Sequence, residues 1–380
     1  MPFAAALSEH PVTAFAVGEA CGQVLEAIGG HPDVVAVFVT QGHAGALEDT
    51  VATIREVLHP TVIVGAASDS IVGTGREVEG GPGVSVWAGR WGPALPVRIA
   101  GGAPSVGLPR QLGFEPTALV LVGDPFSVEV EALLADLADS HPGLPVVGGM
   151  ASGAQGPGGT RLALDGAVHT DGAVGFLLGP GVDVVPVVSQ GCRPIGRPFV
   201  VTDGDGKIVR ALGGRTALER LDELAATLTP DEVRAVNAGG LYLGRVFDER
   251  KADFGPGDFL VRTVLGGDRD TGAVAIDDDV AVGTTVQFHI RDAGAAHDDL
   301  DGLLVRDAPS AEAEAVLLFT CNGRGLRLFG EPDHDAELVA DRIGAVPTAG
   351  MFSAGELGPL AGRNEAHSFT ASLLLLREHR

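Results

Sequence analysis

The chain has 380 residues, of which 45% are hydrophobic, 20% charged and 5% aromatic. This composition excludes a disordered or fibrous protein and allows a sizeable core. The formal net charge of −24 repels phosphate backbones and anionic lipids, so we expect neither a nucleic acid nor a membrane as a partner. The 3 cysteines are too few, and odd in number, for a disulfide framework, which favours a reducing, cytoplasmic compartment.

The N-terminus, MPFAAALSEH, has no basic stretch and only a short apolar run, so we expect no secretory signal. No apolar run in the sequence reaches the roughly 18 residues that a transmembrane helix needs. Both features agree with a cytoplasmic location.

The sequence repeats one order of predicted elements three times: a strand, a helix and two further strands. In the first copy, an apolar strand begins at Val34 and an amphipathic helix covers 47–58. The second strand runs into a Gly-Ala-Ala-Ser step at 65–68, and 83–88 forms the third strand. The first two strands are apolar on both faces, which is typical of strands buried on both sides of a sheet.

The second copy begins with an apolar strand at Ala118, and its helix carries an apolar stripe between residues 130 and 137. Its second strand enters a Gly-Met-Ala-Ser step at 149–152, and 173–178 is its third strand. The same order of elements and the same kind of glycine step therefore recur.

Between the second and third copies, from 182 to 290, the chain has the pattern of short strands joined by turns. The Asp-Gly-Asp-Gly stretch at 203–206 separates two apolar runs and predicts a hairpin. Capping-box patterns predict the starts of two helices, one at Thr216 with Glu219 and one at Thr229 with Glu232.

The third copy begins with an apolar strand at Ala315, followed by a helix at 335–343, a Gly-Met-Phe-Ser step at 350–353 and a closing strand at 368–376. We predict an α/β fold with mixed β-sheets and flanking helices, in which two sheets pack face to face. We also expect the three glycine steps to lie at equivalent strand ends, beginning at Gly65, Gly149 and Gly350.

The motifs of several enzyme classes are absent from the sequence. It contains no Gly-x-x-x-x-Gly-Lys phosphate loop, no Gly-x-Ser-x-Gly elbow, no Cys-x-x-Cys pair and no His-Glu-x-x-His motif. We therefore predict no catalytic residue, no metal and no cofactor, and we favour a binding protein over an enzyme.

Polar side chains gather in glycine-rich turns just after three apolar strands, where α/β proteins build their binding sites. The first two turns each pair a cysteine with an arginine, whose planar fork suits a carboxylate. The third turn begins with an acid that could accept a bond from an ammonium or a hydroxyl group. The ligand-binding residues that we predict are Ser189, Cys192, Arg193, Cys321, Asn322, Arg324, Glu356, Arg363 and Asn364.

Five of these residues are expected to face one common cleft. Two guanidinium groups and one carboxylate in such a cleft would suit a zwitterion, because arginine would bind its carboxylate and glutamate its ammonium. The five are Cys192, Arg193, Asn322, Arg324 and Glu356.

Other interpretations of the same residues remain open. The cysteines could be small buried hydrophobic residues, and Glu356 could be a solvated loop acid. An arginine also lowers the pKa of a nearby thiol, so Cys192 or Cys321 could be the nucleophile of a hydrolase or transferase, with His334 or His367 as its base. A thiol redox sensor is the third alternative.

Six short stretches, in this order and spacing, resemble the FIST family: QGCRPIG at 190–196, DFLVR at 258–262, CNGRG at 321–325, FGEPDHD at 329–335, AGELGP at 354–359 and GRN at 362–364. The resemblance implies a FIST N-terminal-type domain at 32–218 and a FIST C-terminal-type domain at 219–376. It implies a sensory module that binds small ligands such as amino acids.

Members of that family are otherwise fused to signalling outputs or F-box segments, for which this sequence has no residues. The resemblance therefore implies that a separate output signalling protein receives the signal. We expect a stand-alone cytoplasmic sensor of a small polar metabolite, with an amino acid as the leading ligand class.

Overall fold

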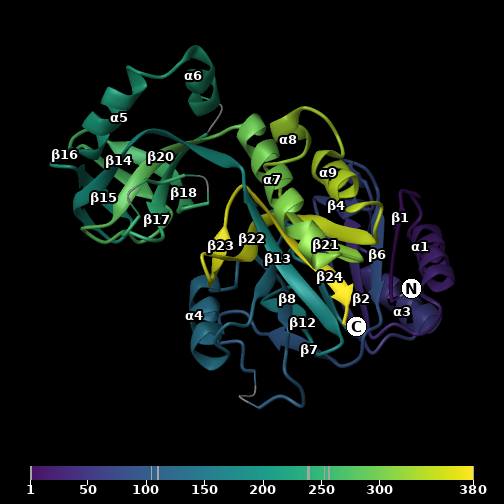
Figure 1. Cartoon of the computed structure of the whole chain (residues 1–380). Helices are drawn as coiled ribbons and strands as arrows, with labels where there is room; N and C mark the ends of the chain where they lie inside the picture. Colours follow the sequence, from purple (N-terminus) through teal and green to yellow (C-terminus); the bar gives the residue numbers. More distant parts are fainter. Residues whose placement is uncertain are drawn as a thin grey trace. The chain divides into compact units, whose positions relative to one another are not determined.

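The computed structural model describes residues 2–103, 105–108, 111–237, 240–251, 253–255 and 257–379, without the side chains of 308–311. It confirms the α/β class, with mixed sheets and flanking helices. The chain divides into two compact units (Figure 1). Unit 1 comprises Met1–Ser189 and Leu300–Arg380, and unit 2 comprises Gln190–Asp299.

All three copies of the repeat lie in unit 1. The first consists of β2 (Val34–Thr40), α3 (Leu47–Leu58), β3 (Val62–Ser68), β4 (Ser70–Gly73), β5 (Arg76–Glu79) and β6 (Val84–Gly89). The second consists of β8 (Ala118–Gly123), α4 (Val130–Ser140), β9 (Val146–Ala151), β10 (Leu162–Leu164), β11 (Ala167–His169) and β12 (Ala173–Leu178). The third consists of β21 (Ala315–Cys321), α9 (His334–Ile343), β22 (Thr348–Leu360), β23 (Arg363–His367) and β24 (Thr370–Glu378).

Further elements of unit 1 extend the sheets and cover their faces. They are β1 (Phe3–Ser8), α1 (Thr13–Ile28), α2 (Gln41–Ala44), β7 (Ala94–Ile99), β13 (Val182–Gln190), α8 (Leu326–Phe329) and the larger part of α7 (Ala293–Ala311).

The strand order is the same in all three copies, so the predicted repeat is confirmed. In each copy the first two strands are parallel and the closing strand lies antiparallel to the first, giving β6-β2-β3, β12-β8-β9 and β24-β21-β22. Each copy also inserts a hairpin before its closing strand. These hairpins are β4 with β5, β10 with β11, and the end of β22 with β23.

The pairing register corrects one expected equivalence. Gly65 of β3 lies opposite Val37 of β2, and Gly350 of β22 lies opposite Leu318 of β21. Val37 and Leu318 are each the fourth residue of the first strand of their copy. In the second copy the residue at this place is Gly148, opposite Leu121, and not the predicted Gly149. All three glycines lie inside strands rather than at strand ends. The Gly-Gly pair of the second copy made the two assignments indistinguishable from sequence alone.

The three hairpins join the copies in a closed cycle. The hairpin of the first copy pairs with the third copy, where Val72 lies opposite Gly350. The hairpin of the second copy pairs with the first, where Ala163 lies opposite Gly65. The hairpin of the third copy pairs with the second, where Leu357 lies opposite Gly148. Each copy therefore supplies a strand that pairs with another copy at its equivalent strand glycine, Gly65, Gly148 or Gly350.

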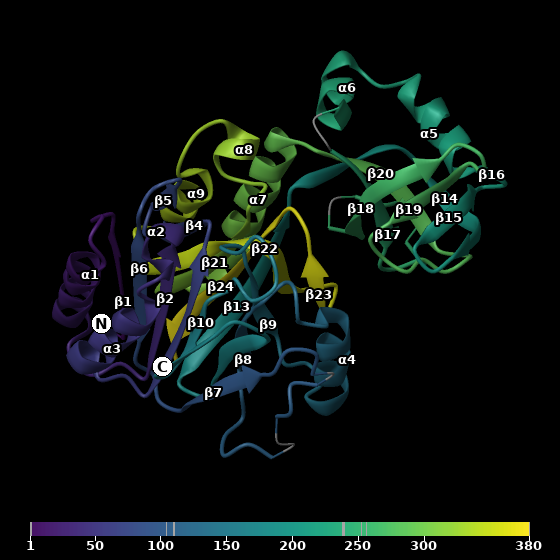
Figure 2. The same ribbon diagram turned by 180° about the vertical axis from the view of Figure 1, so that it is seen from behind.

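The two sheets of unit 1 pack face to face over a shared apolar core, as predicted. Inward residues of β2, β3, β8, β21 and β22 meet there, and the rings of Phe38 and Phe319 lie 5.9 Å apart. The opposite faces are covered by helices: α1 and α3 cover the first sheet, and α4, α7 and α9 cover the second (Figures 1 and 2). This arrangement explains why β2, β3, β8, β9 and β21 are buried along their whole length.

Unit 2 is an antiparallel sheet with two helices and a core of its own. Its order is β14-β20-β17-β18-β19-β15-β16, and an additional pairing joins β14 to β15. Both predicted capping boxes are present, at Thr216 and at Thr229. The elements are β14 (Cys192–Asp205), β15 (Ile208–Leu212), β16 (Arg215–Thr216), α5 (Ala217–Ala225), α6 (Pro230–Asn237), β17 (Leu241–Val246), β18 (Phe259–Asp268), β19 (Ala273–Ile276) and β20 (Thr285–Arg291).

Across the described parts of both units, no helix is long and apolar enough to cross a bilayer.

The two units do not follow each other in sequence order. Residues 190–218, which belong to the N-terminal-type stretch expected at 32–218, lie in unit 2, and the chain returns to unit 1 only at Leu300.

Candidate functional site

A buried ion pair lies just beyond the carboxyl end of β21 in unit 1. Arg324 is 0% exposed and its guanidinium makes two bonds to Asp335 of α9, from Nε to Oδ2 and from Nη2 to Oδ1, both 2.8 Å long. Thr320 Oγ1 donates a third bond to Asp335, at 2.6 Å. Burial alone would raise the pKa of Asp335, but Arg324 and the surrounding hydrogen bonds outweigh it and hold that pKa well below its usual range. Both groups are therefore charged.

Glu77, from the first copy of the repeat, lies beside this ion pair and binds the start of α9. Glu77 lies on β5, and its Oε1 accepts bonds from the backbone N–H groups of Asp335 and Ala336, at 3.2 and 3.1 Å. These N–H groups begin α9, where a helix favours an acceptor. Burial, followed by the negative charge of Asp335, raises the pKa of Glu77 well above its usual value. The neighbouring Glu79 accepts a bond from Leu326 N, at the start of α8.

Glu356 and Cys321 form the other side of the same cluster. Glu356 is 0% exposed, and its Oε2 accepts bonds from the backbone N–H and the hydroxyl of Thr370, at 3.1 and 2.8 Å. Burial raises its pKa to about 8, although Thr370, the Cys321 thiol and the charge of Arg324 act in the opposite direction. Glu356 therefore changes its protonation state close to neutral pH.

Several buried polar atoms of this cluster lack a hydrogen-bond partner among the residues that the structure describes. They are Glu77 Oε2, Asn322 Oδ1, Arg324 Nη1, Ser353 Oγ and Glu356 Oε1. An unsatisfied buried polar group costs about 1–3 kcal/mol, so such a concentration is unusual in a purely structural core. Perturbed pKa values beside unused polar atoms indicate a functional site. We call these residues, with Thr320, Cys321, Asp335 and Thr370, the buried polar cluster.

The structure brings together four of the predicted ligand-binding residues in unit 1. Cys321, Asn322, Arg324 and Glu356 all belong to the buried polar cluster, where charge interactions join Arg324 to both Cys321 and Glu356. The fork of Arg324, which we expected to bind a ligand carboxylate, is taken by Asp335, and only Nη1 is unused. The site is therefore closed around an internal ion pair.

Three other predicted residues lie where the chain passes between the units. Ser189 is fully buried at the end of β13 in unit 1. Cys192 and Arg193 belong to unit 2, and Arg193 makes ion pairs with Asp292 at 2.7 Å and with Glu232 at 3.0 Å. A common cleft of Cys192 and Arg193 with the buried polar cluster stays a prediction.

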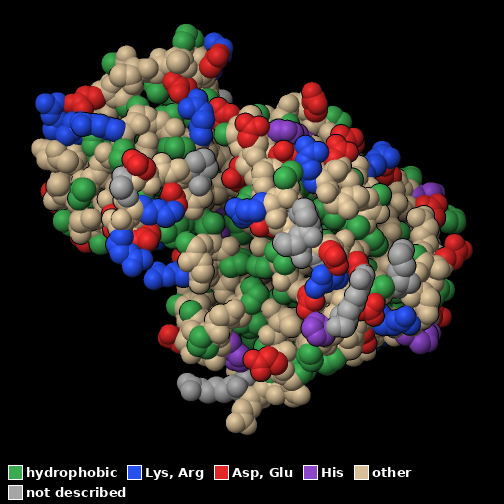
Figure 3. All heavy atoms as spheres, in the orientation of Figure 1, with side chains coloured by type: hydrophobic (Ala, Val, Ile, Leu, Met, Phe, Trp, Pro, Cys, Tyr) green, Lys and Arg blue, Asp and Glu red, His purple; other side chains and the backbone are tan. Residues whose placement is uncertain are grey.

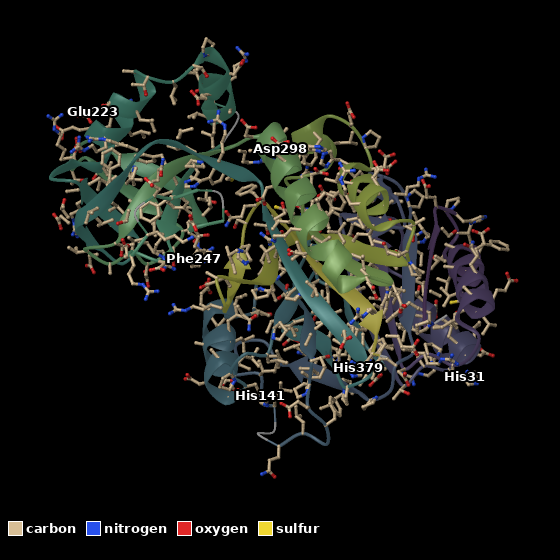
Figure 4. The ribbon with its side chains drawn as sticks, viewed as in Figure 1. His31, His141, Glu223, Phe247, Asp298 and His379 are labelled. Carbon is tan, nitrogen blue, oxygen red and sulfur yellow. The ribbon has the colours of Figure 1, made fainter. Side chains whose placement is uncertain are left out.

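The last two predicted residues line a surface pocket of unit 1, with a volume of about 760 Å³. It lies between α4 and β23, and Figure 4 marks one end of this region by His141, which follows α4. Asn364 fixes the wall, because its Oδ1 accepts a bond from Val146 N at 2.9 Å and its Nδ2 donates to Leu144 O at 2.8 Å. Arg363, in contrast, is exposed on the pocket wall.

Much of the remaining pocket lining is apolar or acidic. Leu134, Leu144 and four prolines supply apolar surface, and Glu131 and Glu365 supply carboxylates. A concave, largely apolar pocket with a few charged groups is the usual form of a small-molecule site. Among the described residues, no group of histidine, cysteine and acidic side chains has the arrangement of a metal site.

Sequence reasoning missed Glu77, Asp335 and Thr370. Asp335 lies inside the FGEPDHD stretch at the start of a helix, so a capping acid close to Arg324 was a usable signal. Glu77 carried none, because an acid on a short strand of one copy is ordinary until the register places it against a helix of another.

Comparison with known proteins identifies the two halves of the sequence. The FIST N domain family model matches residues 33–215, and the FIST C domain family model matches residues 217–359. Uncharacterized protein Rv0628c of Mycobacterium tuberculosis (strain ATCC 25618 / H37Rv) is 42% identical over 380 residues, which cover 97% of this chain and 98% of the relative. Uncharacterized protein Mb0898c of Mycobacterium bovis (strain ATCC BAA-935 / AF2122/97) is 42% identical over 368 residues, covering 94% of each chain.

Proposed function

The chain belongs to the FIST family, and from this premise we propose that it is a small-ligand sensor whose ligand binds in the pocket between α4 and β23. FIST domains are associated with sensory signal transduction. The observation that carries the proposal is the exposed guanidinium of Arg363 on the wall of a pocket of about 760 Å³.

The proposed ligand is a zwitterion of the amino-acid class. Arg363 would bind its carboxylate through the planar fork, and Glu131 on α4 would bind its ammonium. The apolar lining from Leu134, Leu144 and the prolines would receive a side chain. Opposite charges on two walls, separated by apolar surface, match such a ligand better than they match a simple anion or cation.

The hairpin of β22 and β23 supplies a route for the signal. Arg363 begins β23 at the pocket, and His367 at the other end of β23 lies opposite Glu356 in the register. A ligand that shifts β23 would therefore change the surroundings of Glu356, whose pKa is about 8. A two-state element biased by ligand binding is what a sensor requires. A separate output protein in the cytoplasm would read this change.

Calorimetric titration with a panel of amino acids tests the proposal, using the wild type, Arg363→Ala and Arg55→Ala. Loss of a charge-assisted bond of about 1.5–3 kcal/mol should weaken binding about ten- to a hundredfold in Arg363→Ala. Arg55 is an exposed arginine of α3 that does not line the pocket, so its removal should leave the affinity unchanged. Equal affinities of the wild type and Arg363→Ala would refute the assignment.

Arg324 is unsuitable for the same test. Its removal would leave Asp335 buried and unpaired, which costs about 3–5 kcal/mol, so a loss of binding in Arg324→Ala would report unfolding as readily as a lost contact.

A thiol function for Cys321 is the second candidate, because the thiol lies within range of the positive charge of Arg324. A neighbouring cation favours the reactive thiolate. Rapid alkylation of Cys321 by iodoacetamide at neutral pH would support a redox or nucleophilic role. If Cys321 is alkylated no faster than Cys21, which lies buried on α1, the thiol function is excluded and ligand sensing alone remains.

A further inference from the structure

Unit 2 contains a pocket of its own, of about 340 Å³, between β14 and α5. Its floor is apolar and is formed by Ile195, Leu224 and Phe288. The rest of the lining consists of Gly196, Arg197, Phe199, Arg220, Glu223 and Thr227. All of these residues belong to unit 2, so the pocket is independent of the sites in unit 1.

A bulge in β14 creates this pocket. Ile195 pairs with Phe288 and Phe199 pairs with Val286, so four steps along β14 face only two steps along β20. Gln287, which is buried, supports the bulge by donating from Nε2 to Gly196 O at 3.1 Å. Gly196 has a φ of +63°, and a Cβ there would come within 2.7 Å of Leu224 Cδ1. Bulges re-aim side chains and are frequent beside functional sites.

The residue that the bulge presents is Arg197. Its guanidinium carbon lies 5.0 Å from the centroid of the Phe199 ring, and the side chain is exposed. Among the described residues, the contact with the Phe199 ring is the interaction that Arg197 makes, and it has no hydrogen-bond or acidic partner there. Arg220 lies at the same distance from the same ring, but its donors are occupied by Leu212 O, Gly213 O and Glu223. Arg197 is therefore the unused cation of the pocket.

The charges around the pocket limit the ligand class. Glu223 on α5, which Figure 4 labels, is paired with Arg220 and Arg215, so it offers little to an ammonium and repels a second anionic group. Unit 2 as a whole has 13 basic and 19 acidic residues, and Figure 3 shows both kinds on its surface, so its net charge does not select an anion. The pocket itself favours a ligand with a single negative charge, because Arg197 is unused and Glu223 is already paired.

We propose that the pocket of unit 2 binds a small monocarboxylate that carries an apolar chain or ring. The carboxylate pairs with the fork of Arg197, and the apolar part packs on Ile195, Leu224 and Phe288. The volume falls in the range of small-molecule sites. The bulge, with its supporting Gln287 and its left-handed Gly196, presents Arg197 at this pocket, where it lies over the Phe199 ring. This site goes beyond the proposed function, because it takes a different ligand in a different unit.

The experiment is a titration of the full chain with 3-phenylpropanoate, followed by methyl NMR of Ile195 and Leu224. We expect saturable shifts with a millimolar or tighter dissociation constant, and binding at least tenfold weaker in Arg197→Ala, about 1.4 kcal/mol. Arg197→Lys should retain part of the affinity, because it keeps the charge and loses the fork. The neutral analogue 3-phenylpropan-1-ol should bind more weakly than the carboxylate.

Arg250→Ala is the matched control, because Arg250 is an exposed arginine of the same unit that does not line the pocket. It should bind as the wild type does. Arg363→Ala, which tests the pocket of unit 1, should also leave the shifts unchanged, so failure of one proposal is distinguishable from failure of the other. Absence of saturable shifts in the wild type, or equal affinity in Arg197→Ala, would overturn the proposal.

Discussion

Glu356 shows how strongly burial acts on a single side chain. The carboxyl is fully buried, and its Oε1 lacks a hydrogen-bond partner among the described residues, so the folded protein favours the neutral acid. An ordinary glutamic acid in an unfolded chain has a pKa of about 4.3, whereas burial raises the pKa of Glu356 to about 8. The folded state therefore holds a proton that the unfolded state has lost over this whole interval.

This difference predicts a pH dependence of stability. Between about pH 4.3 and pH 8 the folded state binds more protons at Glu356, so its contribution to the unfolding free energy falls as pH rises, by about 1.4 kcal/mol per unit. Urea unfolding of the wild type and Glu356→Gln at pH 5.5 and 7.5 measures this. The variant should gain stability relative to the wild type at the higher pH.

Glu77 has a pKa raised in the same direction and remains in both proteins, so the difference between them isolates Glu356. A gap between wild type and variant that does not change with pH would contradict a buried neutral acid at position 356.

At the scale of elements, Gly148 and Gly350 lie so close to the neighbouring strand that a side chain does not fit at either position. A Cβ on Gly350 would lie 1.7 Å from Leu318 O, and one on Gly148 would lie 1.8 Å from Leu121 O. In both cases the obstacle is backbone of the parallel neighbour, which cannot move without breaking the ladder. Gly355, farther along β22, would place a Cβ at 3.7 Å from His367 O, an ordinary contact.

Gly350 and Gly355, which both lie in β22, therefore form a matched pair for mutation. We expect Gly350→Ala to lower the unfolding free energy by more than about 3 kcal/mol, because overpacking against backbone is at the costly end of its range. Gly355→Ala should change stability by about 1 kcal/mol or less. Denaturant unfolding measures both, and comparable losses in the two variants would show that the register around Gly350 is wrong.

At the scale of the whole molecule, the cyclic exchange of hairpins makes unit 1 one body. Each copy buries its strands against the other two in a shared core, and no copy keeps its hairpin to itself. Unit 2 has a separate core and a separate sheet. Cooperativity should follow these contacts and not the order of the sequence.

Native-state hydrogen exchange can measure this cooperativity. Phe38→Ala should remove about 3–5 kcal/mol and lower the protection of amides in β2, β8 and β21 together, while leaving β17 and β20 unaffected. Phe288→Ala, in the core of unit 2, should do the reverse. Loss of protection confined to the first copy after Phe38→Ala would mean that the copies unfold separately.

The sequence by itself determined the elements, the repeat and the family. The strands at 34–40, 118–123 and 315–321 are almost entirely apolar, and the helices that follow them carry apolar stripes. Such patterns can be recognised from sequence because periodicity is a local property of the chain. The same local information located the turn that holds Asn322 and Arg324, but it was wrong for the other two residues, because Cys321 is the last residue of β21 and Glu356 lies inside β22. Ligand binding by these residues stays a prediction.

Only the tertiary structure decided which groups meet. The sequence could not distinguish Gly148 from Gly149, because both are glycines and only the register with Leu121 separates them. It could not show that Asp335 neutralises Arg324 or that Glu77, far away on β5, caps α9. These contacts depend on strand pairing across hundreds of residues, and a pairing partner is chosen by the packing of the whole core, on which local patterns carry no information.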